Sequence, residues 1–192
     1  MPAWIRMIPD EEADMALGEA LALARTPHGT VDNVMRVHSL RPSTMNGHVA
    51  LYRAVLHDNS NTLPQWLQET ISSYVSILND CAYSLANHWA NARHLIGDDG
   101  RADEIEQALN ARRPEDVFEG MELALLRYAE KLTLRPADMV KADVDALRAA
   151  GADDGRILEL NQIVCYFNYV NRSLNGLGVT TQGDTVGYYT AT

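Results

Sequence analysis

The chain has 192 residues, of which 46% are hydrophobic, and its formal net charge is −10. This length and hydrophobic fraction are typical of one folded domain and exclude a disordered chain. The negative charge and the lack of a Lys/Arg cluster argue against binding to nucleic acid or to an anionic membrane surface.

The expected environment follows from cysteine content and from the absence of targeting patterns. Cys81 and Cys165 are the only cysteines, too few for the disulfide framework of a small secreted domain. The N-terminus lacks a basic segment followed by an apolar core, so we expect no secretory signal. No apolar run approaches the roughly 18–20 residues that a membrane span needs. We therefore expect a soluble cytoplasmic protein.

Helical periodicity runs through most of the chain. Pro42, Pro64 and Pro114 each stand where a proline opens a helix, and Gly176 is placed as a C-terminal cap. The predicted helices cover residues 10–25, 30–40, 42–57, 64–78, 81–96, 102–112, 114–134, 141–151 and 155–176. Turns are expected at 58–62 and 97–101.

The fold class predicted from this pattern is all-α. No linker, fixed-period repeat or alternating strand pattern divides the chain, so residues 1–192 are expected to form a single helical domain. The tail, about residues 178–192, has no helical stripe. Its Val186, Tyr188 and Tyr189 favour docking on the body or on a partner subunit.

The stretch "NDCAYSLANH" holds the candidate site. On a helix that begins at Cys81, the side chains of Cys81, Ser84 and His88 share one face, within an arc of about 60°. A cysteine in the first turn lies near unpaired backbone N–H groups, which favour the thiolate. We therefore expect a depressed pKa for the Cys81 thiol and a reactive sulfur.

Glu69 completes the constellation if the chain reverses at Asn79-Asp80. On one continuous helix Glu69 would lie about 120° away from Cys81. A break at Asn79-Asp80 allows a helical hairpin that returns Glu69 toward the start of the second helix. A carboxylate there is expected to accept the cysteine proton, directly or through water.

These residues resemble the active-site segment of the carboxymuconolactone decarboxylase superfamily, in its alkyl hydroperoxidase D-like, peroxidase-related branch. That pattern is a Glu, eleven residues, then Cys-x-x-Cys-x-x-x-His. Glu69, Cys81 and His88 match the Glu, the first Cys and the His, while Ser84 stands at the second Cys. Further segments resemble this branch and together cover most of the chain: 37–57, 128–139 and 162–179.

The resemblance implies an all-helical fold, assembly as a homo-oligomer (dimer, trimer or hexamer) and antioxidant oxidoreductase chemistry with peroxiredoxin activity. In redox-active relatives the second cysteine attacks the peroxide, the first resolves the product as a disulfide, and the Glu and His relay protons. Ser84 excludes that two-cysteine cycle, because a hydroxyl is neither oxidised by peroxide nor able to form a disulfide.

Three functions remain open. In the first, Cys81 acts alone as a peroxidase or sensor, forming a sulfenic acid that an external thiol reduces. In the second, Glu69 and His88 perform non-redox acid/base chemistry on a small substrate, with lactone decarboxylation as the nearest precedent. In the third, the protein is a non-catalytic oligomeric binding module. Tyr83 is a candidate for lining the substrate pocket in any of them.

No metal or cofactor is expected. The histidines show no His-x-x-x-His pair, and no Cys-x-x-Cys pair is present. The sequence also lacks a glycine-rich phosphate loop, a nucleophile elbow and a dinucleotide fingerprint. The catalytic candidates are thus Glu69, Cys81, Ser84 and His88.

Overall fold

The computed structural model describes residues 1–189, and these form a single all-helical domain, as expected. No strand occurs within the described residues. The helices are α1 (Met15–Leu23), α2 (Asn33–Arg36), α3 (Pro42–Leu56), α4 (Gln65–Leu78), α5 (Ala82–Ile96), α6 (Asp99–Asn110), α7 (Gly120–Leu134), α8 (Lys141–Ala149) and α9 (Asp154–Leu177). Short 3₁₀ turns occupy Asp10–Glu12, Pro114–Asp116 and Pro136–Asp138.

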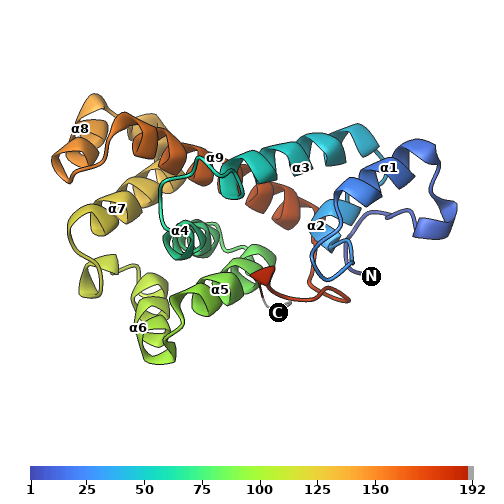
Figure 1. Ribbon diagram of the computed structural model, residues 1–192, viewed down its shortest axis with the longest axis horizontal. Helices are drawn as coiled ribbons and strands as arrows, with labels where there is room; N and C mark the ends of the chain where they lie inside the picture. Colours follow the sequence, from blue (N-terminus) through green and yellow to red (C-terminus); the bar gives the residue numbers. More distant parts are fainter. Residues whose placement is uncertain (190–192) are drawn as a thin grey trace.

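Helix α4 is the centre of the domain. It is contacted by α5, α7 and α9, which surround it in Figure 1. Because it is covered on nearly every side, its hydroxyl groups need internal partners. Ser72, Ser73 and Ser76 each donate to the backbone carbonyl four residues earlier, at 2.7–2.8 Å. The polar residues of α4 therefore lie in the core without unsatisfied hydroxyls.

A tight reversal joins α4 to α5. Asp80 takes a left-handed conformation with φ of 52°, and the N–H of Cys81 donates to the Ser76 carbonyl at 2.9 Å. A short polar residue such as Asp tolerates that conformation better than a branched one. The break expected at Asn79-Asp80 is therefore present, and the two helices pack as an antiparallel hairpin.

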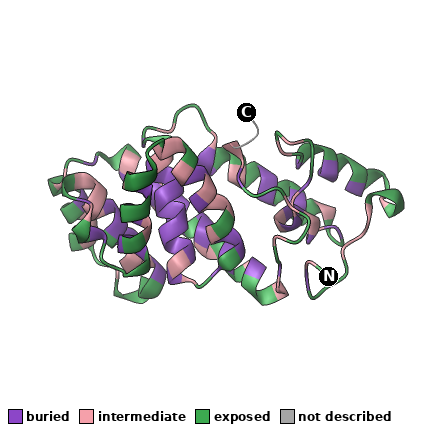
Figure 2. Cartoon of the chain, turned by 90° about the horizontal axis from the view of Figure 1, so that it is seen from below, coloured by how far each residue is buried: buried purple, intermediate pink, exposed green. Residues whose placement is uncertain are grey.

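Two groups of buried side chains meet beside this hairpin. The larger group surrounds α4 and includes Tyr74 and Phe167, whereas a smaller one joins α1 to α3 through Leu17 and Met45. Tyr52 packs against both groups. Figure 2 shows buried residues concentrated in the central helices, with exposed residues on the outer ones. The boundary between the groups is where the cavity described below lies.

The segment after α9 lies on the body of the same chain. The backbone carbonyls of Thr180 and Gln182 accept from the Asn33 side chain, each at 3.0 Å. The Tyr83 hydroxyl donates to Asp184 at 2.6 Å, and the N–H of Tyr188 donates to the Asn91 side chain at 2.6 Å. The described part of the tail thus packs against α2 and α5. Residues 190–192 of the expected tail lie outside the described residues.

The structure differs from three of the predicted helix boundaries. The helix expected over 10–25 begins only at Met15, because the Asp14 side chain caps it by accepting from the N–H of Leu17 at 2.8 Å. The helix expected over 30–40 is confined to α2, Asn33–Arg36. The turn expected at 97–101 is largely helix, since Asp98 caps α6 and starts it at Asp99.

Two further predictions fail later in the chain. Pro114 opens only a 3₁₀ turn, and α7 begins at Gly120, because the intervening Phe118 turns inward and is buried beneath the Arg101 guanidinium. Gly176 is not the cap of the last helix. That helix continues to Leu177, and Gly178 takes the left-handed cap conformation with φ of +60°.

The two glycines give a matched test of the cap. A Cβ at Gly178 would lie 2.1 Å from the Trp4 ring and would sit at a positive φ, whereas a Cβ at Gly176 would meet nothing within 4 Å. We expect Gly178→Ala to lower the free energy of unfolding by about 1 kcal/mol or more, and Gly176→Ala to raise it by up to about 1 kcal/mol. Urea unfolding followed by circular dichroism checks both, and equal effects of the two substitutions would contradict the assigned cap.

Candidate functional site

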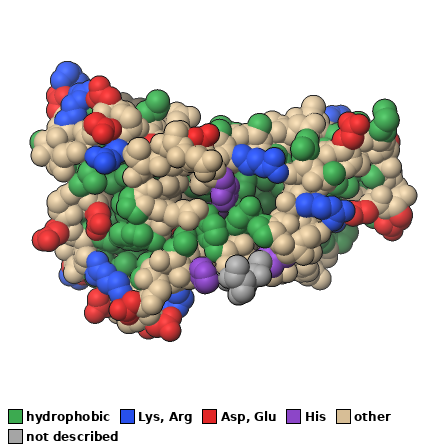
Figure 3. All heavy atoms as spheres, viewed as in Figure 1, with side chains coloured by type: hydrophobic (Ala, Val, Ile, Leu, Met, Phe, Trp, Pro, Cys, Tyr) green, Lys and Arg blue, Asp and Glu red, His purple; other side chains and the backbone are tan. Residues whose placement is uncertain are grey.

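A cavity of about 290 Å³ lies at the boundary between the N-terminal helices and the α4–α5–α9 body. Figure 3 shows hydrophobic side chains gathered in the middle of one face, with many of the acidic and basic side chains toward its ends. The cavity wall contains Leu23, Ala24, Arg25, Thr26, Asp32, Val34, Met35, Val49, Tyr52, Arg53, His57, Tyr83, Ser84, Asn87, His88, Asn91, Tyr166, Val170, Leu174 and Tyr188. Its size suits a small organic molecule.

Glu69 and His88 form the strongest polar contact beside this cavity. Glu69 on α4 is 1% exposed, and its Oε2 accepts from Nδ1 of His88 at 2.6 Å. Its Oε1 accepts from the Asn91 side chain at 3.3 Å. The hairpin thus pairs Glu69 with residues in the second and third turns of α5, and not with Cys81 at its start. Both oxygens of the buried carboxylate have partners, as a buried charge requires.

The His88 ring is oriented from two sides. Besides the Glu69 contact, it packs edge-on against Phe167, with ring centroids 4.6 Å apart. Because Nδ1 donates to the carboxylate, the neutral ring carries its lone pair on Nε2. No described residue bonds to Nε2, and His88 is part of the cavity wall. His88 therefore offers a basic nitrogen to a bound molecule.

Ser84 lies one turn before His88 in the same wall. Its hydroxyl is 2.9 Å from that of Ser76, and the Ser76 hydroxyl is also 2.8 Å from the Ser72 carbonyl. In the contact between the two serines Ser76 is the donor and Ser84 the acceptor, and the Ser72 carbonyl is a second acceptor for the Ser76 proton. The Ser84 hydroxyl can therefore serve a ligand as a donor or as an acceptor.

Cys81 is placed differently from the other candidates. It is the N-cap residue of α5 and 2% exposed, and it is absent from the cavity wall. Burial raises the pKa of its thiol; the backbone N–H of Ser84 opposes that effect, and the charge of Asp80 adds to it. The prediction of a depressed pKa is therefore wrong, because desolvation outweighs the favourable backbone groups.

Tyr83 belongs to the cavity wall and also holds the tail. Its hydroxyl donates to Asp184 and accepts from the N–H of Val34 at 3.1 Å. Burial and the neighbouring Asp184 raise the pKa of the phenol, which stays protonated. With its polar atom already bonded on both sides, Tyr83 offers a ligand mainly its ring.

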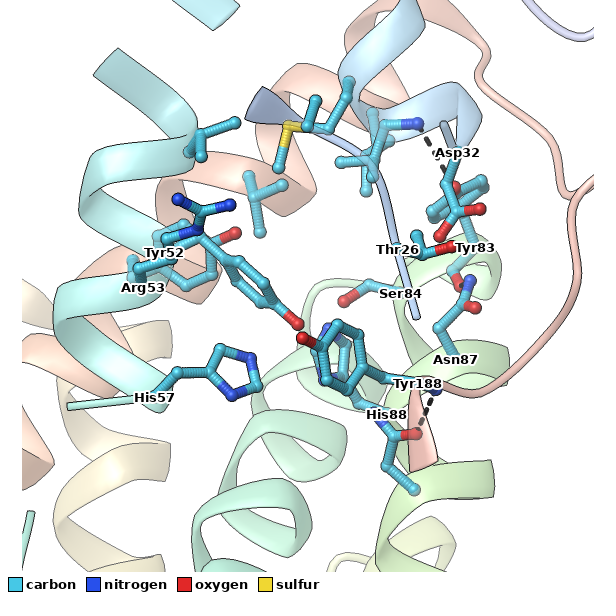
Figure 4. A pocket seen from close by; sticks show the side chains of 18 of the residues that line it. Thr26, Asp32, Tyr52, Arg53, His57, Tyr83, Ser84, Asn87, His88 and Tyr188 are labelled. Carbon is cyan, nitrogen blue, oxygen red and sulfur yellow. Dashed lines mark hydrogen bonds between the residues drawn. The ribbon is translucent and has the colours of Figure 1, made fainter. Parts of the chain in front are cut away.

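Several wall residues were not anticipated as site residues. His57 and Asn91 were not anticipated from the sequence, and Tyr188 was expected only to dock the tail. Figure 4 shows the Tyr52 and Tyr188 hydroxyls close to one another in front of His88, with His57 beside them. Asn91 alone had an available signal, because it follows His88 by three residues and so shares its helical face.

Asp32 is the acidic residue in the wall, at the opposite end from Arg53 in Figure 4. Its Oδ1 is buried without a hydrogen-bond partner. Burial raises the pKa of this carboxyl to about 6, the charge of Asp184 adds to the effect, and His28 and Arg36 oppose it. The charged form of the Asp32 carboxyl is therefore destabilised in the folded protein.

Within residues 1–189, no group of three or more His, Cys, Asp or Glu is arranged to hold a metal ion. Among the same residues, no helix has the length and apolar character needed to cross a membrane.

Comparison with known proteins places the fold. No protein-family model and no curated protein matches the chain. An uncharacterised peroxidase-related protein from Ralstonia eutropha JMP134, described as an alkylhydroperoxidase core, matches with a TM-score of 0.81 and 21% identity over 96% of this chain and 94% of that one. A peroxidase-related protein from Silicibacter sp. TM1040 matches with a TM-score of 0.79 and 23% identity over 98% and 95%.

A solved enzyme of different chemistry shares the architecture. The debrominase Bmp8 matches with a TM-score of 0.74 and 16% identity over 95% of this chain and 92% of that one. A variant of that enzyme was solved in complex with 2,3,4-tribromopyrrole. At these identities the likeness establishes the fold, which is the alkylhydroperoxidase-like helical fold.

We predict that the Cys81 thiol reacts slowly with peroxide because it is buried. Because its pKa is raised, little thiolate exists at neutral pH, and the thiolate is the form that attacks a peroxide. In a Cys165→Ser background, which leaves Cys81 as the only sulfhydryl, we expect no sulfenic acid adduct with a dimedone-type probe after treatment with hydrogen peroxide. Mass spectrometry of the intact protein measures it. A Cys81 adduct that forms within seconds would contradict the buried placement.

We predict that ionisation of Asp32 makes the stability of the protein depend on pH. Its pKa is about 6 in the folded protein against 3.8 for the free group, so the folded state binds more protons across this window and stability falls as pH rises through it. After a discount for the partial exposure of Asp32, the free energy of unfolding falls by about 1 kcal/mol across this window. We expect Asp32→Asn to unfold at higher urea than wild type above about pH 6, with the difference shrinking toward about pH 4. The exposed Asp138→Asn is the control, and a parallel trend in it would refute the assignment.

Proposed function

We propose that the protein is a non-redox enzyme in which His88 acts as a general base, oriented by Glu69, on a small organic substrate in the cavity. The observation that carries this proposal is the unpartnered Nε2 of His88 in the cavity wall, with the buried Glu69 carboxylate on its other nitrogen. This is the arrangement in which an imidazole is held in one tautomer and its protonated form is stabilised.

The step supported by this geometry is a proton transfer. The His88 Nε2 lone pair takes a proton from an acidic C–H, O–H or N–H bond of the substrate, whose electron pair stays on the substrate. The imidazolium that forms lies 2.6 Å from the Glu69 carboxylate, which stabilises its charge. The proton then returns to another substrate atom or to water. The hydroxyls of Tyr52 and Tyr188 are available to donate to the developing negative charge.

Small carbonyl compounds and lactones are the substrate classes that fit this step, with decarboxylation of a lactone as the precedent suggested by the resemblance. The cavity volume supports a small molecule. The bound 2,3,4-tribromopyrrole of the Bmp8 variant is consistent with small planar ligands in this fold. We further propose, on the resemblance alone, a cytoplasmic homo-oligomer.

A one-cysteine thiol peroxidase is the second candidate. The peroxidase-related description of two solved neighbours favours it. In this function Cys81 would be oxidised by a peroxide and reduced by an external thiol. The position of Cys81, buried and outside the cavity wall, counts against it. For that reason acid/base chemistry is the function we favour.

The test is proton exchange on a panel of small carbonyl and lactone compounds. In D₂O, a working base replaces the acidic C–H of its substrate by C–D, which proton NMR records. We expect His88→Gln to lower the exchange rate by about 10²–10⁴-fold. A smaller loss is expected for Glu69→Gln, since the amide keeps an acceptor for Nδ1 but not the charge. Cys81→Ala is expected to keep the wild-type rate.

The three variants separate the candidate functions. Exchange that is lost in Cys81→Ala and kept in Glu69→Gln would overturn the acid/base proposal in favour of thiol chemistry. Wild-type protein that is folded but gives no exchange on any member of the panel would favour the non-catalytic binding module. Circular dichroism of each variant controls for misfolding, because Glu69 is buried.

A further inference from the structure

A chain of side-chain hydrogen bonds runs from the surface to the cavity wall. Nδ1 of His38 lies 2.8 Å from the hydroxyl of the exposed Thr44, and its Nε2 lies 3.1 Å from Nδ1 of His48. Nε2 of His48 lies 2.8 Å from the hydroxyl of Tyr166. His48 and Tyr166 are buried, and Tyr166 belongs to the cavity wall.

The donor and the acceptor of each hydrogen bond in this series follow from the bond that Thr44 makes at its exposed end. The Thr44 hydroxyl lies 2.8 Å from the Arg41 carbonyl and donates its single proton there, so it must accept from Nδ1 of His38. A neutral His38 then has its lone pair on Nε2 and accepts from Nδ1 of His48. By the same rule, Nε2 of His48 accepts from the Tyr166 hydroxyl.

Both histidines carry a single ring proton at neutral pH. Burial lowers the pKa of His48 to about 4, with a smaller contribution from His38, and burial also lowers the pKa of His38. Neither ring is therefore a double donor at neutral pH. The consequence is that the Tyr166 proton is held by His48, and the phenol oxygen has only lone pairs left.

A second wall residue also presents only a lone pair, because the Glu69 contact leaves Nε2 of His88 as an acceptor. Tyr166 and His88 line one cavity, so a molecule that touches both meets two acceptors. Filling such a site with a molecule that lacks a donor would leave buried acceptors unpaired, which costs affinity.

We propose that this part of the cavity selects small molecules that carry an O–H or N–H donor, with Tyr166 as a specificity-determining residue whose acceptor role is imposed through His48, His38 and Thr44. The inference rests on the activity proposed above and narrows its carbonyl and lactone substrates to those that carry an O–H or N–H group. It concerns these two acceptors only, since the hydroxyls of Ser84, Tyr52 and Tyr188 can serve a ligand as donors or acceptors.

The proton directions are tested first, in the wild-type protein without any ligand. With ¹⁵N-labelled histidine, long-range ¹H–¹⁵N NMR spectra distinguish the two neutral tautomers. We expect both His38 and His48 to be protonated on Nδ1 at neutral pH. Thr44→Val removes the acceptor that sets this direction and is expected to release His38 into a tautomer mixture. Protonation of His48 on Nε2 in the wild type would overturn the inference, because Tyr166 would then be free to donate.

Donor selection is tested with matched probes. Phenol and anisole differ by one methyl group on the oxygen, and pyrrole and furan differ by one N–H. Dissociation constants are measured by NMR titration of labelled protein. We expect phenol and pyrrole to bind about three- to tenfold more tightly than their partners, the effect of one hydrogen bond. Tyr166→Phe is expected to reduce that preference while leaving the affinity for anisole nearly unchanged.

Tyr169→Phe is the matched control, because Tyr169 is on the same helix and beside His48 but is 46% exposed and outside the cavity wall. It is expected to keep the preference. Equal binding of phenol and anisole, binding of neither, or a preference that survives in a folded Tyr166→Phe protein would each overturn the inference. Because binding needs no turnover, a failed exchange assay with donor preference intact would count against the proposed activity alone.

Discussion

A carboxylate that is almost completely buried on the central helix is the constraint on which this site depends. Glu69 needs donors on both oxygens, and within residues 1–189 they come from His88 and Asn91 of α5. Those two positions reach Glu69 only if the chain reverses at Asp80 and the two helices run antiparallel. The same contact selects the His88 tautomer. One buried charge therefore determines the register of the hairpin and the chemical character of the cavity wall.

The tail is connected to the buried Glu69 contact through Asn91. Its amide group donates to Glu69, which turns its oxygen toward the backbone N–H of Tyr188 at 2.6 Å. Tyr188 in turn joins the cavity wall. The segment that closes the cavity is thus connected, through one side chain, to the residue that orients the base. Fully paired buried networks of this kind favour a single arrangement over its alternatives, because each broken bond leaves an unsatisfied group behind.

Much of the fold and part of the site could be predicted from the sequence, for physical reasons that also mark the limits. Helices 42–57 and 64–78 were predicted to within a residue or two, because proline openings and apolar stripes are local signals. The return of Glu69 to α5 followed from the break at Asn79-Asp80, but its partner was expected to be Cys81 and is His88. The burial of Cys81 could not be predicted, since a position at a helix start says nothing about what covers it. The contact between His48 and Tyr166, 118 positions apart, has no periodic signal at all.

The serine at position 84 gains a different meaning from its surroundings. In the family motif it is the place of a missing sulfur, whereas in the structure it is a hydroxyl in the same cavity wall as the free nitrogen of His88. A thiol there would be next to a base and open to the cavity, whereas the remaining thiol of Cys81 is neither. The serine excludes a two-cysteine cycle but leaves His88 and its carboxylate partner, whose contact is built into the hairpin itself. The same scaffold carries proteins described as peroxidase-related and a debrominase, as expected when one fold hosts different functions through different side chains.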